Sequence, residues 1–304
     1  MKRKHGFTLV ELLVVMAIIA LLIGLLLPAL AKARAQAMLT KDSAQIKEVH
    51  QSWIVFSREL KGALPTPGLI DRLEDPVLGE VPGRGPEDYE ANWTGPLFSV
   101  CIMRHYFTPQ LTISPSEPSG NVLSMDNYNY NAYQPLGENV DCPEDPDDNS
   151  DSYWDCKFDV TLFGTCNTSY AHMPIAGERK KRHWKDTLDS TMGMIGTRGV
   201  RDGNYINELQ YYRSVTLEFH GGHKEWVGII AFNDNHVERL DTFLPEHLNY
   251  NIGEDAFADN IFNDDTGDGS GGYGTDGGFD IWLVIYKEIN DDPLLPEISK
   301  IQWD

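Results

Sequence analysis

An apolar run near the N-terminus constrains this chain more than any other feature. From Phe7 to Ala31 the only charged residue is Glu11, and residues 12–27 are apolar or glycine without a break. As a helix rising about 1.5 Å per residue, this run would extend roughly 37 Å, more than the roughly 30 Å core of a bilayer. The run is therefore predicted to cross a membrane. Basic residues at positions 2–4 precede it, so the positive-inside rule predicts a cytoplasmic N-terminus.

Three interpretations of this run compete. A cleaved secretory signal would have a shorter apolar stretch ending at a small-residue site, and only 29–31 (Ala-Leu-Ala) offers one. A plain membrane anchor gives no role to Glu11, whose charge costs several kcal/mol inside a membrane. The third interpretation accounts for both the length of the apolar run and the presence of Glu11. Gly6 followed by Phe7-Thr8-Leu9-Val10-Glu11 resembles the cleavage and methylation motif of type IV prepilins and type II secretion pseudopilins.

This resemblance implies a processing pathway and a set of partners. A prepilin peptidase would cut between Gly6 and Phe7, release the leader 1–6 and N-methylate Phe7. The subunit would leave the inner membrane through assembly machinery and join a homo-oligomeric helical filament, with related minor pilins, in the periplasm or outside the cell. Glu11 would then meet the Phe7 ammonium of a neighbour, so that two costly buried charges become one pair that also fixes axial register. Pro28 matches the helix-interrupting proline of many pilins, although it could equally be a kink at the membrane exit.

The helical pattern continues beyond the apolar run. Apolar residues recur at helical spacing and form one stripe, namely Ile46, Val49, Trp53, Phe56 and Leu60. Gly62 can end the helix, and prolines at 65 and 67 prevent its continuation. One helix is predicted over 7–61, with 7–31 as the membrane or filament core and the remainder packed on a globular domain.

Residues 62–304 are predicted to form a β-rich head. Short β-like runs separated by turn residues occur at 97–103, 122–125, 128–133, 158–163, 167–173, 214–219, 226–232 and 279–289, with weak helical patterns at 181–195 and 243–248. The predicted fold class is α+β, a pilin-like long helix on an antiparallel sheet with long irregular loops. The whole chain has a net charge of −21, yet residues 1–60 carry eight basic and four acidic side chains, so the acidity lies in the head. Such a charge excludes general nucleic-acid binding.

A second resemblance involves the histidines of the head. His220-Gly-Gly-His223, followed by Phe232-Asn-Asp234-Asn235-His-Val, is similar to the C-terminal module of large pseudopilin-like proteins, in which a His is followed nine residues later by Asp-Gly. Here ten residues intervene and Asn235 replaces the Gly. Asn tolerates a left-handed backbone, so a tight hairpin turn is still predicted at Asp234-Asn235. His220, His223 and His236 could alternatively bind zinc, but structural hydrogen bonding is favoured.

Four cysteines lie beyond the predicted membrane segment: Cys101, Cys142, Cys156 and Cys166. An even number in an oxidising compartment favours two disulfides, for which three pairings are possible. A Cys142–Cys156 bond would close a very polar loop, where a covalent link makes physical sense. Free buried thiols are the alternative.

An acidic, glycine-rich loop spans 263–280. Asp264, Thr266, Asp268 and Gly269 reproduce the first half of a calcium loop, whereas the expected Glu is missing and Asp276 sits one place late. Flanking helices are not expected, so the hypothesis is a calcium site that is not an EF-hand, set against a solvated flexible loop.

Residues 179–183 form a basic cluster, interpreted either as a contact with a neighbouring subunit's acidic loop or as a solvated loop.

No Gly-x-Ser-x-Gly, phosphate loop, His-Glu-x-x-His or dinucleotide motif occurs, so the chain is not expected to be an enzyme. The leading hypothesis is a structural filament subunit. The alternative is a membrane-displayed carbohydrate- or ligand-binding module using Trp93, Trp154, Trp184 and Trp226 as stacking faces, although such aromatics more often form a core.

Overall fold

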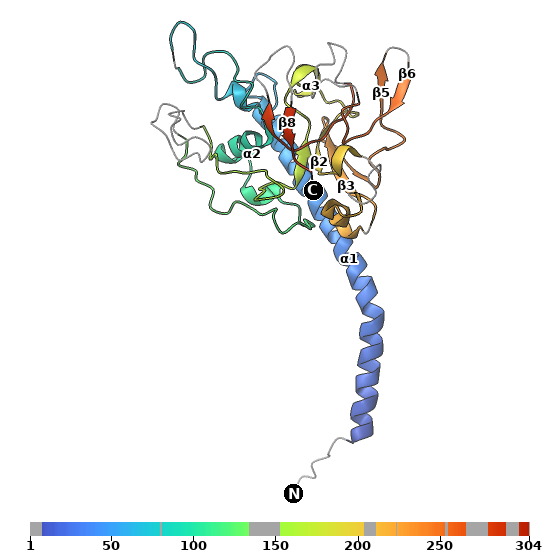
Figure 1. Cartoon of the computed structure of the whole chain (residues 1–304). Helices are drawn as coiled ribbons and strands as arrows, with labels where there is room; N and C mark the ends of the chain where they lie inside the picture. Colours follow the sequence, from blue (N-terminus) through green and yellow to red (C-terminus); the bar gives the residue numbers. More distant parts are fainter. Residues whose placement is uncertain are drawn as a thin grey trace.

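The structure is a long helix whose upper half is embedded in a β-rich head (Figure 1). This computed structural model describes residues 8–79, 81–133, 153–203, 211–222, 224–252, 255–265, 279–289 and 298–303. The helix, α1, spans Leu9–Ser57. In Figure 1 its lower half stands clear of the head, and the head gathers around its other end.

The continuity of α1 and its apolar stripe are confirmed. Ile46, Val49, Trp53 and Phe56 are fully buried, and Leu60, just past the helix, is half-buried against the same core. The helix continues through Pro28 and ends at Ser57, four residues before the predicted end. Gly62 then donates its backbone N–H to the Ser57 carbonyl oxygen at 2.8 Å, with a left-handed φ of 100° that suits glycine.

A four-stranded antiparallel sheet lies against the buried half of α1, so the α+β fold class is confirmed. The strands pair in sequence order, β1-β2-β3-β4. They are β1 (Tyr170–His172), β2 (Gly193–Thr197), β3 (Gly228–Phe232) and β4 (Val237–Leu240). Two antiparallel pairs complete the strands, β5 (Asn249–Ile252) with β6 (Asp255–Ala258) and β7 (Tyr286–Ile289) with β8 (Ile298–Ile301).

Short helices connect these strands. They are α2 (Thr94–Met103), α3 (Gly177–His183) and the 3-10 helices η1 (Pro67–Leu69), η2 (Pro109–Thr112), η3 (Arg201–Gly203) and η4 (Val215–Gly221). The connection after α1 is irregular, and η1 is the one helical turn among its described residues, 62–79 and 81–93.

Several strand predictions are wrong. Residues 97–103 belong to α2, which is buried on every side, so its apolar residues show no helical period that would distinguish it from a strand. Residues 214–219 form a 3-10 turn because the Ser214 hydroxyl accepts the Thr216 N–H and starts it. The runs at 122–125, 128–133 and 158–163 contribute only isolated bridges at Val122 and Val160. Residues 243–248 contain turns instead of a helix.

The predicted turn between β3 and β4 is confirmed. Asn235 adopts a left-handed φ of 66°, and its N–H donates to the Phe232 carbonyl at 2.8 Å. The Asp234 carboxylate accepts the His236 N–H at 3.0 Å and closes the turn. The His236 ring stacks on Phe232 at 4.4 Å between ring centroids. Asn235 therefore supplies the left-handed backbone conformation that a glycine would otherwise supply at this turn.

The prediction of two disulfides is wrong for two of the four cysteines. Cys101 and Cys166 are free, buried thiols. Cys101 lies within α2, and the Cys166 thiol donates to the Thr168 carbonyl at 3.2 Å. Burial raises the pKa of Cys166 to about 12, so this thiol stays protonated and unreactive. Cys156 is disulfide-bonded, whereas Cys142 lies outside the described residues.

Trp53 is the central anchor between α1 and the head. Its indole lies 5.4 Å from the Trp184 ring, 6.1 Å from Phe98 and 6.4 Å from His172, measured between ring centroids. Replacing Trp53 with Ala should lower the free energy of unfolding by about 3–5 kcal/mol because it leaves a cavity in the core. Urea unfolding of the full chain in detergent micelles, followed by near-UV circular dichroism, would measure this loss.

Val55→Ala provides the matched control two residues away on the outer face of the same helix. Val55 is 39% exposed, so its truncation should change the free energy of unfolding by less than about 1 kcal/mol. Equal losses for the two variants would contradict the assignment of Trp53 as the anchor.

Candidate functional site

The start of α1 carries a reciprocal capping box at the motif found in the sequence. The Glu11 N–H donates to the Thr8 hydroxyl oxygen at 3.2 Å, while the Thr8 N–H and hydroxyl donate to the Glu11 carboxylate at 2.8 and 2.7 Å. This arrangement satisfies donors that any helix start leaves unpaired. Glu11 therefore holds the first turn in shape before any partner arrives. Gly6 and Phe7, the predicted cleavage pair, lie outside the described residues.

The half of α1 that follows Glu11 has no protein partner in the described structure. Residues 8–34 are all exposed, and large apolar side chains cover every side of this stem, from Leu9 at 80% to Leu30 at 66%. Within the described residues, α1 alone is long and apolar enough to cross a membrane. Water would not tolerate so large an apolar surface, so a membrane or other apolar helices must cover it.

Where α1 enters the head, a buried carboxylate fixes the rotation of the helix about its axis and its position along that axis. Asp42 is fully buried, and its oxygens accept the Tyr170 hydroxyl at 2.6 Å and the Ser114 hydroxyl at 2.8 Å. His220 Nε2 lies 3.2 Å from the same carboxylate, and its Nδ1 is 3.0 Å from the Ser116 hydroxyl. Burial and the nearby Asp42 charge raise the pKa of the Tyr170 phenol, which stays protonated and donating.

Asp42 is not among the site residues predicted from the sequence, although the sequence carries a signal for it. Asp42 precedes Ile46 by four residues, so it continues the apolar stripe of Ile46, Val49 and Trp53 toward the N-terminus. A charged residue on a face that is otherwise buried requires polar partners from another part of the chain.

A second polar contact joins α1 to the β3–β4 turn. His50 Nδ1 lies 3.1 Å from the Asn235 side-chain oxygen, and the Asn235 amide donates to the Gln51 side chain at 2.6 Å. Asn235 therefore provides both the left-handed backbone of the turn and side-chain contacts with α1, and glycine could not form those contacts. His220 and His236 are hydrogen-bonded to Ser116 and Asp234, which is consistent with the predicted structural role of the histidines. His223 lies outside the described residues. No group of three or more His, Cys, Asp or Glu side chains among those described could hold a metal ion.

Both interpretations of the basic cluster at 179–183 are wrong for its first two residues. Arg179 is fully buried and forms ion pairs with Asp280 and, at 2.9 Å, with Asp264. Lys180 is paired with Glu87. The partners lie more than 80 residues away in sequence, so a local pattern could not reveal them. A buried guanidinium of this kind requires paired carboxylates.

The same ion pair bears on the predicted calcium ligands. The Asp264 carboxylate already contacts Arg179, and the neighbouring Asp265 N–H donates to Asp280 at 2.7 Å. Thr266, Asp268 and Asp276 lie outside the described residues.

The tryptophans proposed as stacking faces are in the core: Trp154, Trp184 and Trp226 are buried, and Trp93 is half-buried. They therefore do not present open faces to a carbohydrate.

Comparison with known proteins agrees with the geometry of the stem. A family model described as a prokaryotic N-terminal methylation motif matches residues 1–27. This match is consistent with a type IV pilin or pseudopilin, and together with the uncovered apolar helix it supports a membrane-anchored protein. No curated protein and no solved structure matches the chain.

Buried histidines at the junction predict sensitivity to acid. Burial lowers the pKa of His50 and of His172 to about 4, whereas an unfolded histidine titrates near 6.5. Between these values the unfolded chain binds protons that the folded chain does not, so each histidine should cost up to about 3 kcal/mol as the pH falls from 6.5 to 4. Burial raises the pKa of Asp259 to about 7, so over the same range this group binds a proton in the folded chain first. Its protonation therefore increases the free energy of unfolding as the pH falls, opposite to the effect of the histidines.

Substitution separates these contributions. In His50→Gln the fall in unfolding free energy between pH 6.5 and 4, measured by urea unfolding at each pH, should be smaller than in the native chain. His247→Gln is the control, because His247 is exposed. An unchanged pH dependence in His50→Gln would show that His50 is not held neutral by the fold.

Proposed function

We propose that this chain is a structural subunit of a type IV pilus-like or type II secretion filament. The observation that carries the proposal is the uncovered apolar half of α1, which begins at the capping box of Thr8 and Glu11 inside the matched methylation motif. In the membrane the stem is covered by lipid, and in a filament it is covered by the stems of neighbouring copies.

Processing gives Glu11 a second role. Cleavage after Gly6 by prepilin peptidase places an ammonium at Phe7, four residues before Glu11, and methylation keeps it charged. When stems pack together, the Glu11 carboxylate of one copy pairs with the Phe7 ammonium of another, because either charge alone would be costly in an apolar filament core. Such pairing sets the axial step between subunits.

The proposed path begins in the inner membrane. The basic residues 2–4 hold the N-terminus in the cytoplasm, and the head, residues 62–304, lies on the outer side. Removal of leader 1–6 and extraction by the assembly machinery place the subunit, with related minor pilins, in a periplasmic or extracellular filament. Pro28 lacks the N–H that would complete the local helical ladder, so the stem can bend there as subunits pack.

Three variants separate the charge of Glu11 from its capping role. Glu11→Ala removes both, whereas Glu11→Gln keeps a capping side chain and removes the charge. Both should abolish filaments seen by electron microscopy, while the head keeps its native near-UV circular dichroism. Thr8→Ala removes the cap at a cost of about 1 kcal/mol to the helix start and should leave filaments intact.

The comparison among these variants decides the role. Normal filaments from Glu11→Gln would contradict the charge pairing. Normal filaments from both Glu11 variants would contradict the assembly role of this residue. Loss of filaments in Thr8→Ala would reassign the effect to helix capping.

We also propose that the acidic loop 263–280 binds calcium, through Thr266, Asp268 and Asp276 with Asp264 at its edge. The supporting feature is the alternation of oxygen donors with glycine. A bound cation should raise the melting temperature of the head by an amount that grows with calcium concentration. Asp268→Asn should remove that rise. An equal melting temperature in calcium and in chelator would contradict the proposal.

A further inference from the structure

An apolar finger, residues 73–79, projects from the head. It belongs to the blue-green loop that extends beyond the rest of the head at the upper left of Figure 1. Val77 is 87% exposed at its tip, and Leu78 and Leu73 are 56% and 51% exposed. Apolar side chains gathered so openly on a domain that faces water mark a contact with another molecule.

The tip of the finger is held in shape by its own hydrogen bonds. Asp75 and Gly79 exchange backbone hydrogen bonds of 3.0 and 2.9 Å. The Asp75 carboxylate also accepts the backbone N–H groups of Val77 and Leu78 at 2.9 and 3.0 Å. The apolar tip is therefore ordered before any partner arrives, which lowers the cost of binding.

The base of the finger is fixed as well. The Arg72 side chain donates to the Leu69 carbonyl at 3.0 Å and to the Gly85 carbonyl at 2.9 Å. Gly85 has a left-handed φ of 95°, and a side chain there would collide with the Leu73 carbonyl oxygen. Glycine therefore lets the two arms of the loop lie close together.

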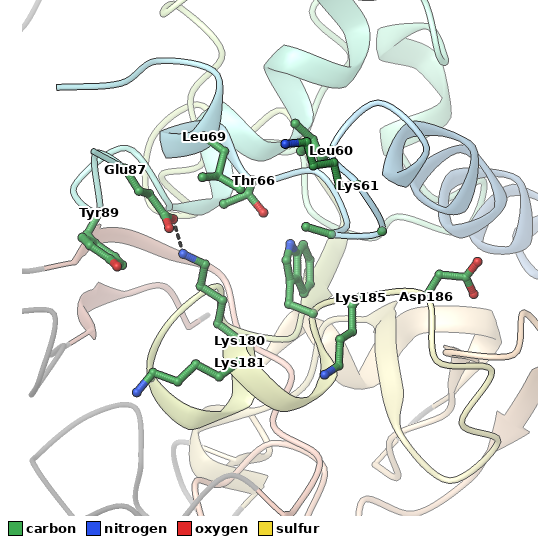
Figure 2. A pocket seen from close by; sticks show the side chains of 14 residues that line it. Leu60, Lys61, Thr66, Leu69, Glu87, Tyr89, Lys180, Lys181, Lys185 and Asp186 are labelled. Atoms are coloured by element: carbon green, nitrogen blue, oxygen red, sulfur yellow. Dashed lines mark hydrogen bonds and ion pairs between the residues drawn. The ribbon is translucent and has the colours of Figure 1, made fainter. Parts of the chain in front are cut away.

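A pocket of about 530 Å³ lies at the base of the finger, between the turn after α1 and helix α3. Leu60, Ala63 and Leu69 line it and are half-buried, so they offer an apolar surface. Figure 2 shows an elongated hollow with residues on two sides and at both ends, namely Leu60 and Lys61 facing Lys181 and Lys185, with Tyr89 and Asp186 at the ends. Such a shape suits a turn of polypeptide. None of residues 73–79 lines the pocket, so the finger of the same chain does not fill it.

The pocket and the finger carry opposite charges. Four lysines and two carboxylates line the pocket, and Lys61 and Lys185 have no ion pair with any described side chain. Beside the apolar tip the finger carries Glu74 and Asp75, which likewise have no ion pair among the described residues. Two chains of net charge −21 repel each other, so a cationic hollow is a place where an acidic segment of another copy is attracted.

We propose that the finger of one copy of this chain inserts into the pocket of a neighbouring copy. Val77 and Leu78 enter between the apolar walls, and the acidic residues beside them lie against the lysines. Finger and pocket are different surfaces, so the contact is heterologous and repeats from head to head without closing, as a helical filament requires. The contact rests on the proposed filament function, in which the stems hold neighbouring heads at a high effective concentration.

Disulfide cross-linking between two variants of the full chain tests this contact. Cells would produce one tagged chain with Leu78→Cys and a second, differently tagged chain with Ala63→Cys, and their membranes would be treated with a mild oxidant. The product that carries both tags should form at least about tenfold more than with Phe163→Cys in place of Leu78→Cys, since Phe163 is 81% exposed but lies outside the finger. The native Cys166 should stay silent because burial keeps its thiol protonated.

Further substitutions separate the apolar and the charged parts of the contact. Adding Val77→Ser to the finger variant should lower the yield of mixed product about fivefold or more, because less apolar surface is buried. Lys61→Gln with Lys185→Gln in the pocket variant should lower it about threefold or more, and added salt should lower it too. Lys157→Gln, an exposed lysine outside the pocket, should leave the yield unchanged.

A folding control keeps a negative result informative. Near-UV circular dichroism of each purified variant in detergent micelles shows whether the head has its native packing. If Ala63→Cys loses that spectrum, Leu60→Cys takes its place as the pocket position, since Leu60 lines the same hollow.

The outcomes for the contact and for the filament are distinct. Absence of the mixed product from folded chains, or as much product with Phe163→Cys, would refute the contact, and filaments formed by those chains would leave the proposed function standing. A product joining two Leu78→Cys chains at equal yield would place finger against finger and also refute the contact. Mixed product from cells that form no filaments would uphold the contact and contradict the proposed function instead.

Discussion

The uncovered apolar half of α1 is the constraint on which the rest of the structure depends. Residues 8–34 are all exposed, whereas from Leu39 onward one face of the same helix is buried in the head. One rigid element therefore joins an apolar environment to an aqueous one. The head must hold its half of the helix firmly, since any force on the stem passes through α1 into the core around Trp53.

Packing and polar contacts share that task. The aromatic cluster around Trp53 packs α1 against the head, but apolar packing alone permits small slips and rotations. Asp42, bonded to Tyr170 and Ser114, and Asn235, bonded to His50 and Gln51, oppose such slips because movement would leave buried polar groups unpaired. The β3–β4 turn and the sheet thereby fix where the helix leaves the head.

The sequence predicted features that are local or periodic. The stem, the stripe from Ile46 to Phe56 and the left-handed turn at Asn235 follow from helical spacing and backbone preference. It could not predict the partners of Arg179, because Asp264 and Asp280 come close only when distant loops fold together. The helix α2 was mistaken for a strand because it is apolar on every side. At the candidate site, the methylation motif is recognisable in the sequence, whereas the reciprocal hydrogen bonds between Thr8 and Glu11 are seen only in the structure.

The most direct test of the central claim is the intact mass and N-terminal sequence of the protein purified from its cell membranes. The account predicts a chain that lacks residues 1–6, begins at Phe7 and carries one added methyl group on its N-terminal nitrogen. A mature protein that still begins at Met1, or one cut near Ala31 with the apolar stem removed, would contradict it.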